Sequence, residues 1–171
     1  MPNPEVTSQP LLELRPSSIQ GLGAFAFRPI GKGTRIVEYL GERITPEEAD
    51  ERYDDDAMER PHTFLFTVNK KTVIDAARQG NEARFINHSC EPNCEAVVED
   101  GRVFIQAVHD ILPGAELTYD YHLERPGRYR VEWKERYACH CGASSCRGTL
   151  LQPRRRRVRK TSRGGSKRSK K

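Results

Sequence analysis

The segment Arg84-Phe85-Ile86-Asn87-His88-Ser89-Cys90-Glu91-Pro92-Asn93-Cys94 decides how this 171-residue chain is interpreted. It contains two of the five cysteines, and the other three follow in a C-x-C-x4-C pattern over residues 139–146. Closely spaced thiolates of this kind can bind one zinc ion within a tight turn. Structural zinc sites are closed by a fourth ligand, so the residues predict that either Cys90 or Cys94 completes the site.

The cysteine pattern also bears on His140 and on the cellular compartment. His140 lies between two of the proposed ligands, and we expect its side chain to point away from the ion. The sequence opens with no basic segment followed by an apolar one, and its apolar runs are far shorter than the ~20 residues that span a bilayer. Thiols in such a chain are better explained as metal ligands or free groups than as disulfides. We therefore expect a soluble protein of the cytosol or nucleus, without membrane contact.

Short runs of β-forming residues, separated by turn residues, lie on both sides of the central segment. Gly21-Leu22-Gly23 is expected to be a turn, and Asp100-Gly101 is a common hairpin signal. Thr45-Pro46-Glu47-Glu48 predicts the start of a helix that continues to about Tyr53, with Thr45 as N-cap. The pattern predicts a mostly-β domain with few short helices. Strands are expected over residues 11–15, 24–27, 34–40, 63–68, 72–75, 95–99, 102–107 and 116–121.

The charge of the chain is divided unevenly between its body and its end. Residues 154–171 contain 11 of the 29 Lys and Arg residues and no acid. The remaining residues hold 18 basic and 24 acidic side chains, a net charge of −6, which should attract a basic peptide. The basic end offers nothing to bury, so we expect a disordered tail. Such a tail can aid solubility, act in localisation, or contact nucleic acid or a nucleosome.

Two stretches resemble the signatures of the SET-domain family of protein-lysine N-methyltransferases. They are the central segment 84–94 and Glu116-Leu117-Thr118-Tyr119-Asp120-Tyr121. Residues 21–26 and 38–42 also resemble the family, and the segment through Arg147-Gly148 is similar to its post-SET zinc motif. The resemblance implies the SET-domain fold, in which small β-sheets surround a pseudoknot and the second signature passes beneath a loop formed by the first.

The resemblance also divides the chain and assigns the zinc ligands. It implies a flexible arm over 1–10, a SET domain over 11–133, a post-SET zinc segment over 134–152 and a basic tail over 153–171. The cysteine-rich pre-SET region of many relatives is not found in this sequence. The first cysteine of the central signature joins the post-SET thiolates in the family, which leaves Cys94 as a small buried side chain. The implied structural zinc ligands are Cys90, Cys139, Cys141 and Cys146.

The resemblance further implies S-adenosylmethionine as the methyl donor and a tyrosine-lined channel for the substrate lysine. Tyr121 matches the family's catalytic tyrosine, and Tyr39 matches a second channel tyrosine. Tyr119 occupies the position where the family uses Phe or Tyr to set how many methyl groups fit, so mainly mono- or dimethylation is expected. The implied cofactor-binding residues are Gly21, Leu22, Gly23, Arg84, Phe85, Asn87 and His88.

These features predict an enzyme that methylates a lysine of a basic protein, such as a histone or a histone-like nucleoid protein. Desolvation and a neighbouring sulfonium would lower the lysine pKa from about 10.4 and free the amine for attack. The location would be the nucleus or chromosome if the substrate is a histone, and the cytoplasm or nucleoid if the protein is bacterial. Relatives often cover the cofactor with an aromatic residue where this chain has Thr149, so cofactor affinity is less firmly implied than the fold.

Three alternatives compete with this reading. The first is a catalytically inactive SET-fold module that binds chromatin or nucleic acid, supported by the basic tail. The second is methylation of the tail itself at Lys160, Lys167, Lys170 or Lys171, which mass spectrometry after incubation with cofactor would test. The third, a metallohydrolase, fails because all four zinc positions are filled and no general base stands nearby in the sequence. The sequence does not indicate the oligomeric state.

Overall fold

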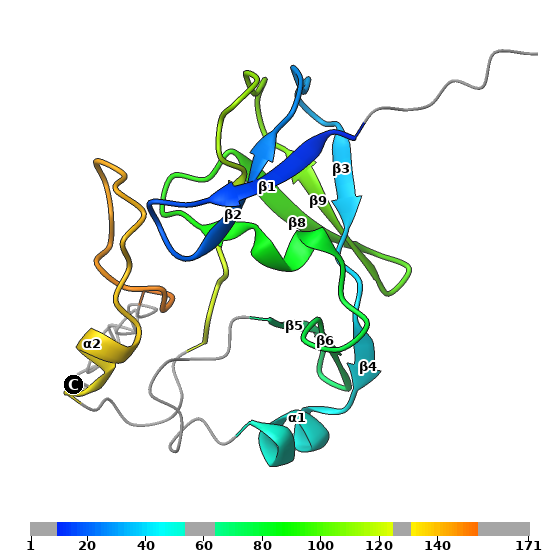
Figure 1. Cartoon of the computed structure of the whole chain (residues 1–171). Helices are drawn as coiled ribbons and strands as arrows, with labels where there is room; N and C mark the ends of the chain where they lie inside the picture. Colours follow the sequence, from blue (N-terminus) through cyan, green and yellow to red (C-terminus); the bar gives the residue numbers. More distant parts are fainter. Residues whose placement is uncertain (1–9, 54–63, 125–130, 154–171) are drawn as a thin grey trace, which may run out of the picture.

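The computed structural model describes residues 10–53, 64–124 and 131–153. The expected N-terminal arm before Pro10 and the basic tail after Pro153 lie outside the described residues. The described part is mostly β, as the sequence predicts, and Figure 1 shows its strands in two groups, with the C-terminal segment beside them. No helix within it is long and apolar enough to cross a membrane.

Most elements lie where the sequence predicts them: the strands over 72–75 and 102–107 match at both ends, and the other boundaries shift by at most two residues. The capping box at Thr45 is present, since its side chain accepts a hydrogen bond from the Glu48 amide and the Glu48 side chain accepts one from the Thr45 amide. Asp100 and Gly101 have φ angles of 49° and 74°, as a tight primed hairpin turn requires. The elements are β1 (Leu12–Pro16), β2 (Leu22–Ala26), β3 (Arg35–Glu38), β4 (Glu42–Ile44), α1 (Pro46–Arg52), β5 (Leu65–Asn69), β6 (Thr72–Asp75), the 3-10 helix η1 (Glu82–Phe85), β7 (Asn87–His88), β8 (Cys94–Glu99), β9 (Arg102–Ala107), β10 (Thr118–Tyr119) and α2 (Trp133–Arg136).

Several sequence-based boundaries are wrong. The predicted strand over 116–121 is regular only in β10, because Glu116 instead bridges Phe25 of β2. Of the predicted turn over residues 21–23, only Gly21, whose φ is 51°, lies outside a strand. Leu22 and Gly23 are the first two residues of β2. The strand β4 and the helices η1 and α2 were not predicted, because none of them carries a sustained periodic pattern.

The strands form four small sheets. Antiparallel pairs make the order β1-β2, the three-stranded order β3-β9-β8 and the three-stranded order β4-β6-β5, while β10 pairs with β7 in parallel. The main core lies beneath β2 and β9 and includes the fully buried residues Ala24, Val103, Ile105 and Leu117. A separate small apolar cluster around Ile44 and Val73 joins α1 to the β4-β6-β5 sheet. This sheet and α1 make up the second group of elements in Figure 1.

The pairing of β7 with β10 brings the two signature segments together. Thr118 is opposite Asn87 and Tyr119 is opposite His88. Asn93 holds the second segment in this position, because its Nδ2 donates to the Glu116 carbonyl at 2.8 Å and its Oδ1 accepts from the Thr118 amide at 2.9 Å. Residues about 30 apart in the sequence therefore lie side by side, the arrangement that the expected pseudoknot requires.

Candidate active site and metal centre

An aromatic cluster connects the three tyrosines that the sequence singles out. The ring centroids of Tyr119 and Tyr121 are 4.9 Å apart, and Phe66 of β5 lies 6.4 Å from Tyr119 and 5.4 Å from Tyr39. Tyr39 is 2% exposed and Tyr119 is 5% exposed. The structure thus brings together residues from three distant parts of the chain, and it adds Phe66, which carried no distinguishing signal in the sequence.

Two of the tyrosine hydroxyls are oriented by backbone carbonyls. The Tyr121 hydroxyl donates to the Ile86 carbonyl at 3.0 Å, and the Tyr39 hydroxyl donates to the Phe64 carbonyl at 3.1 Å. Burial raises the pKa of both phenols, so they stay protonated at neutral pH. Each oxygen therefore uses its proton on the protein and keeps lone pairs that can accept a hydrogen bond from a bound group.

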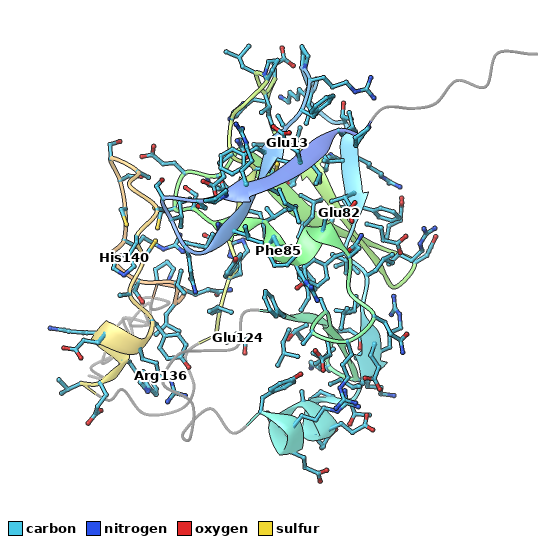
Figure 2. All side chains as sticks on the ribbon, viewed as in Figure 1. Glu13, Glu82, Phe85, Glu124, Arg136 and His140 are labelled. Atoms are coloured by element: carbon cyan, nitrogen blue, oxygen red, sulfur yellow. The ribbon has the colours of Figure 1, made fainter. Side chains whose placement is uncertain are left out.

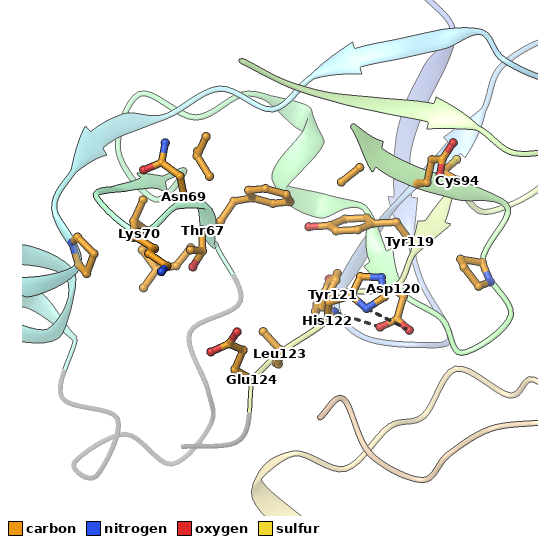
Figure 3. A pocket seen from close by; sticks show the side chains of 18 of the residues that line it. Thr67, Asn69, Lys70, Cys94, Tyr119, Asp120, Tyr121, His122, Leu123 and Glu124 are labelled. Carbon is orange, nitrogen blue, oxygen red and sulfur yellow. Dashed lines mark hydrogen bonds and ion pairs between the residues drawn. The ribbon is translucent and has the colours of Figure 1, made fainter. Parts of the chain in front are cut away.

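Three members of the cluster, Phe66, Tyr119 and Tyr121, line a pocket of about 950 Å³, whereas Tyr39 is not among its lining residues. β5 and the segment from Tyr119 to Glu124 line opposite sides, and Figure 3 shows the Tyr119 ring reaching across from one side toward the other. Glu95 and Glu124 contribute carboxylates to the lining, while Lys70 contributes an ammonium group. An aromatic end and an acid-bearing rim suit a long side chain that ends in a cation.

The polar side chain of Asn87 organises the turn before β2. Its Nδ2 lies 3.2 Å from both the Gln20 and the Leu22 carbonyls and 2.9 Å from Glu116 Oε1. At Gly21, no atom lies within 4 Å of the place that a Cβ would occupy, and the Leu22 side chain is 44% exposed. The turn therefore presents bare backbone and an apolar side chain, features that fit the close approach of a nucleoside-like cofactor.

Two other predicted cofactor residues, His88 and Arg84, make polar contacts within the protein itself. The His88 ring is 2% exposed, its Nδ1 accepts a hydrogen bond from the Tyr121 amide at 3.1 Å, and its Nε2 lies 3.5 Å from Cys90 Sγ. Burial lowers the pKa of His88 to about 4, so the imidazole is neutral and its ring supports the strand and the thiolate. Arg84 lies over the Phe85 ring at 4.7 Å and donates to the Ala76 carbonyl.

Glu116 is a site residue whose position the sequence did not reveal. Its Oε1 accepts hydrogen bonds from the Ser17 hydroxyl at 2.7 Å and from Asn87. A Cβ built on Gly23 would lie 2.3 Å from this oxygen and 3.0 Å from Ser17 Cβ. A side chain at position 23 would therefore have to displace the Glu116 carboxylate from its hydrogen bonds with Ser17 and Asn87.

We expect Gly23→Ala to destabilise the protein by about 1–3 kcal/mol, since the added methyl group pushes the Glu116 carboxylate away from its hydrogen bonds with Ser17 and Asn87. It should also weaken the binding of S-adenosylmethionine, because displacing Glu116 releases Asn87 from the turn. Urea denaturation and isothermal titration calorimetry measure the two effects. Gly31→Ala is the matched control, because only Thr34 Oγ1, at 3.9 Å, lies near its Cβ position. If Gly23→Ala and Gly31→Ala bind the cofactor with equal affinity, the turn does not belong to the cofactor site.

Four cysteines form a metal-binding cluster. The Sγ atoms of Cys90, Cys139, Cys141 and Cys146 all lie within 4.8 Å of one another. Backbone amides support them: the Cys90 amide points to Cys141 Sγ at 3.5 Å, and the Arg147 amide points to Cys90 Sγ at 3.3 Å. Four clustered cysteines, two of which accept these N–H···S bonds, fit a structural zinc ion.

The structure resolves both alternatives that the sequence left for this centre. Cys90 belongs to the cluster, whereas Cys94 is 1% exposed at the start of β8 and burial raises its pKa to about 12. His140 is exposed and is not a member of the cluster, as predicted, and Figure 2 shows it on the C-terminal loop at the side of the molecule.

The zinc segment is attached to the body at two further places. Trp133, Tyr137 and Leu151 form a small core of their own, against which Leu123 packs. Arg147 forms a bidentate pair with Asp120, which lies between the two signature tyrosines. Neither attachment was predicted, because each depends on contacts between segments that are far apart in the sequence.

Comparison with known proteins agrees with this arrangement. Residues 21–122 match the family described as SET domain. The chain is 41% identical over 141 residues to "Histone-lysine N-methyltransferase, H3 lysine-4 specific" of Eremothecium gossypii, which covers 78% of this chain and 14% of the relative. A protein of the same description from Schizosaccharomyces pombe is 40% identical over 144 residues, or 81% of this chain and 15% of the relative.

"Histone-lysine N-methyltransferase SETD1" of Drosophila melanogaster is 39% identical over 144 residues, which cover 81% of this chain and 8% of that protein. The chain thus spans only 8% to 15% of the length of these relatives. The family match extends from the Gly21 turn through both signature segments and the tyrosine cluster. The chain therefore belongs to the SET domain family.

Proposed function

We propose that this protein is a lysine N-methyltransferase that transfers a methyl group from S-adenosylmethionine to a histone lysine. The observation that carries the proposal is the cluster of Tyr39, Tyr119 and Tyr121, of which Tyr119 and Tyr121 line the pocket. The Tyr121 hydroxyl bonds the Ile86 carbonyl, directly before the Asn87 that organises the turn. An inactive module that only binds chromatin has no need for oriented, buried hydroxyls at this position. The names of the relatives make lysine 4 of histone H3 the first substrate to test.

The proposed division of labour places the substrate lysine in the pocket and the cofactor against the turn at Gly21 to Gly23. S-adenosylmethionine supplies an electrophilic methyl group on a sulfonium. The aromatic side chains exclude water from the lysine amine, which lowers its pKa and favours the neutral nucleophile. The Tyr121 and Tyr39 oxygens, whose protons are engaged by backbone carbonyls, accept hydrogen bonds from the amine and aim its lone pair.

The experiment is methyl transfer from labelled S-adenosylmethionine to recombinant histone H3, with products read by mass spectrometry. Histone H3 in which lysine 4 is replaced by arginine serves as the matched substrate. Label on lysine 4 that is missing from the replaced histone supports the full proposal, and label on another lysine supports the activity but not the position. Cofactor binding without transfer to any histone would point to a narrower substrate, and the lack of cofactor binding as well would favour the inactive module.

Tyr119 is proposed to limit the number of methyl groups added. Hydrogen bonds within the described residues engage the hydroxyls of Tyr39 and Tyr121, and none engages that of Tyr119, which leaves it to occupy space near the amine. Tyr119→Phe should therefore shift the products from mono- and dimethyl-lysine toward trimethyl-lysine, with the total rate changed by no more than a few fold. Mass spectrometry of the modified peptide measures the ratio. Mostly trimethyl-lysine from the unmodified protein would contradict this role.

The substrate suggests where the protein acts. The relatives named above come from eukaryotes, so we propose a nuclear, chromatin-associated location in preference to the bacterial alternative. Contact of the basic tail with nucleosomal DNA or another nucleic acid stays a prediction from its sequence, with 11 Lys and Arg residues over 154–171.

A further inference from the structure

Arg147 follows the last cysteine of the cluster, and its side chain reaches Asp120, the residue between the two signature tyrosines. Its two terminal nitrogens donate to the Oδ2 and Oδ1 atoms of Asp120 at 2.6 and 3.0 Å. The side chains are 25% and 16% exposed, so water competes for this pair less than for a surface pair. A bidentate arginine–carboxylate pair fixes orientation as well as distance. The contact therefore defines how the zinc segment sits on the body.

The contact with Arg147 fixes Asp120, and the position of Asp120 in turn affects both tyrosine rings. It lies between Tyr119 and Tyr121, whose rings are 4.9 Å apart. The backbone on its far side is held by His88, which accepts a hydrogen bond from the Tyr121 amide. A shift of the Asp120 carboxylate would thus rotate or translate the backbone from Tyr119 to Tyr121, which positions both rings.

The other end of the contact is anchored in the cysteine cluster. The Arg147 amide donates to Cys90 Sγ at 3.3 Å, and Arg147 directly follows Cys146. A chain of short contacts therefore runs from the proposed zinc ligands through the Arg147 side chain to Asp120. Asp120 lines the pocket, but its carboxylate is engaged by Arg147 and by the His122 amide, and neither side chain of the pair belongs to the aromatic cluster.

We propose that Arg147 and Asp120 form a positioning pair that sets the geometry of Tyr119 and Tyr121 from the zinc segment. The inference rests on the proposed function for its catalytic consequence. The pair acts through the two tyrosines and does not touch the reacting atoms. Its removal should therefore lower kcat while the four cysteines still hold zinc.

The variants are Arg147→Gln, Asp120→Asn and the double variant. Each single change should lower kcat by on the order of 100-fold, the size of effect that a misplacement of about 1 Å produces. The double variant should lose no more than the single variants, because both single changes break the same contact. Arg147→Lys should fall between Arg147→Gln and the unmodified protein, since an ammonium group keeps the charge but not the bidentate geometry.

Arg35→Gln is the matched control, because Arg35 also pairs with a carboxylate, that of Glu99, at an exposed position that does not line the pocket. It should change kcat by less than about twofold. Zinc content, measured by atomic absorption, should equal that of the unmodified protein in all variants. Loss of zinc together with activity would overturn the proposal, since the pair would then serve only to close the metal site. Additive losses in the double variant would also overturn it.

A measurement without turnover separates this inference from the proposed function. Amide hydrogen exchange at residues 119–121 should be at least about tenfold faster in Arg147→Gln than in Arg35→Gln, at equal zinc content. If the protein methylates no substrate but exchange changes in this way, the proposed function fails and the positioning pair stands. If methylation is normal and exchange is unchanged in Arg147→Gln, the pair fails and the proposed function stands.

Discussion

Tyr121→Phe is expected to lower kcat for methyl transfer by about 100- to 1,000-fold, the loss seen when one oriented hydrogen-bonding group is removed from an active site. The reason lies in how the hydroxyl is held. Its proton points to the Ile86 carbonyl at 3.0 Å, so its lone pairs face the rest of the site. Phenylalanine keeps the ring contacts with Tyr119 and His88 but removes this acceptor.

The substitution should leave the fold intact, which makes the loss of rate interpretable. The Tyr121 amide, which bonds His88, is unaffected by the change. Steady-state kinetics on histone H3 measure kcat and KM, and calorimetry measures cofactor affinity. A rise in KM at unchanged kcat would mean that the hydroxyl contributes to binding alone.

Tyr53→Phe provides the matched control for a lost tyrosine hydroxyl. The Tyr53 hydroxyl donates to buried Asp75 Oδ2 at 2.8 Å, beside the pair that Arg52 forms with Glu42, and it lies outside the aromatic cluster. Its removal should lower the free energy of unfolding by about 0.5–1.5 kcal/mol through the lost hydrogen bond and leave kcat within a few fold. If Tyr121→Phe and Tyr53→Phe lose a comparable amount of kcat, the loss in Tyr121→Phe is explained by lower stability and not by the missing acceptor.

Local sequence rules predicted the parts of the fold that depend on neighbouring residues. The hairpin at Asp100-Gly101 and the capping box at Thr45 follow from backbone conformation and short-range hydrogen bonds, and both are present. The three-residue strand β4 escaped prediction because it is fixed by pairing with β6, about 30 residues further along the chain. Local propensity contains no information about such a partner.

The candidate site shows the same division more sharply. Cysteine spacing alone left Cys90 and Cys94 equivalent, and the resemblance favoured Cys90, which lies in the four-cysteine cluster whereas Cys94 does not. Spacing could not reveal that the Glu116 carboxylate occupies the place of a Cβ at Gly23, since this contact joins residues 93 positions apart. The sequence motif identifies His88 but does not indicate whether its ring is buried. The structure shows that it is.

Removing the zinc ion is expected to unfold the C-terminal segment while the β core remains. The two parts have separate apolar cores: Trp133, Tyr137 and Leu151 form one, and the larger cluster around Ile105 forms the other. A cluster of three buried side chains is too small to offset the entropy of ordering about 20 residues. Binding of a structural zinc ion contributes about 10–16 kcal/mol in small domains, so we expect a zinc ion bound by the four cysteines to be the dominant stabilising element of this segment.

Cys139→Ser tests this directly, because Cys139 is 9% exposed and its Sγ lies 3.7 Å from Cys90 Sγ. The variant should bind less than about a tenth of the zinc of the unmodified protein and lose more than about 100-fold in kcat. Trp133 is the only tryptophan in the chain, so a red shift of its fluorescence reports unfolding of this segment alone. Far-ultraviolet circular dichroism should retain the β signal of the core.

Cys94→Ala distinguishes loss of the ion from loss of a buried thiol. Cys94 is more deeply buried than Cys139 but packs in the main core, outside the metal cluster. This variant should keep its zinc and its tryptophan emission while the free energy of unfolding falls by about 1 kcal/mol, because one small buried group is removed. A chelator should then reproduce the Cys139→Ser spectrum in the unmodified protein and in Cys94→Ala. Unchanged Trp133 emission after complete removal of zinc would mean that the packing of the segment on Leu123 holds it without the ion.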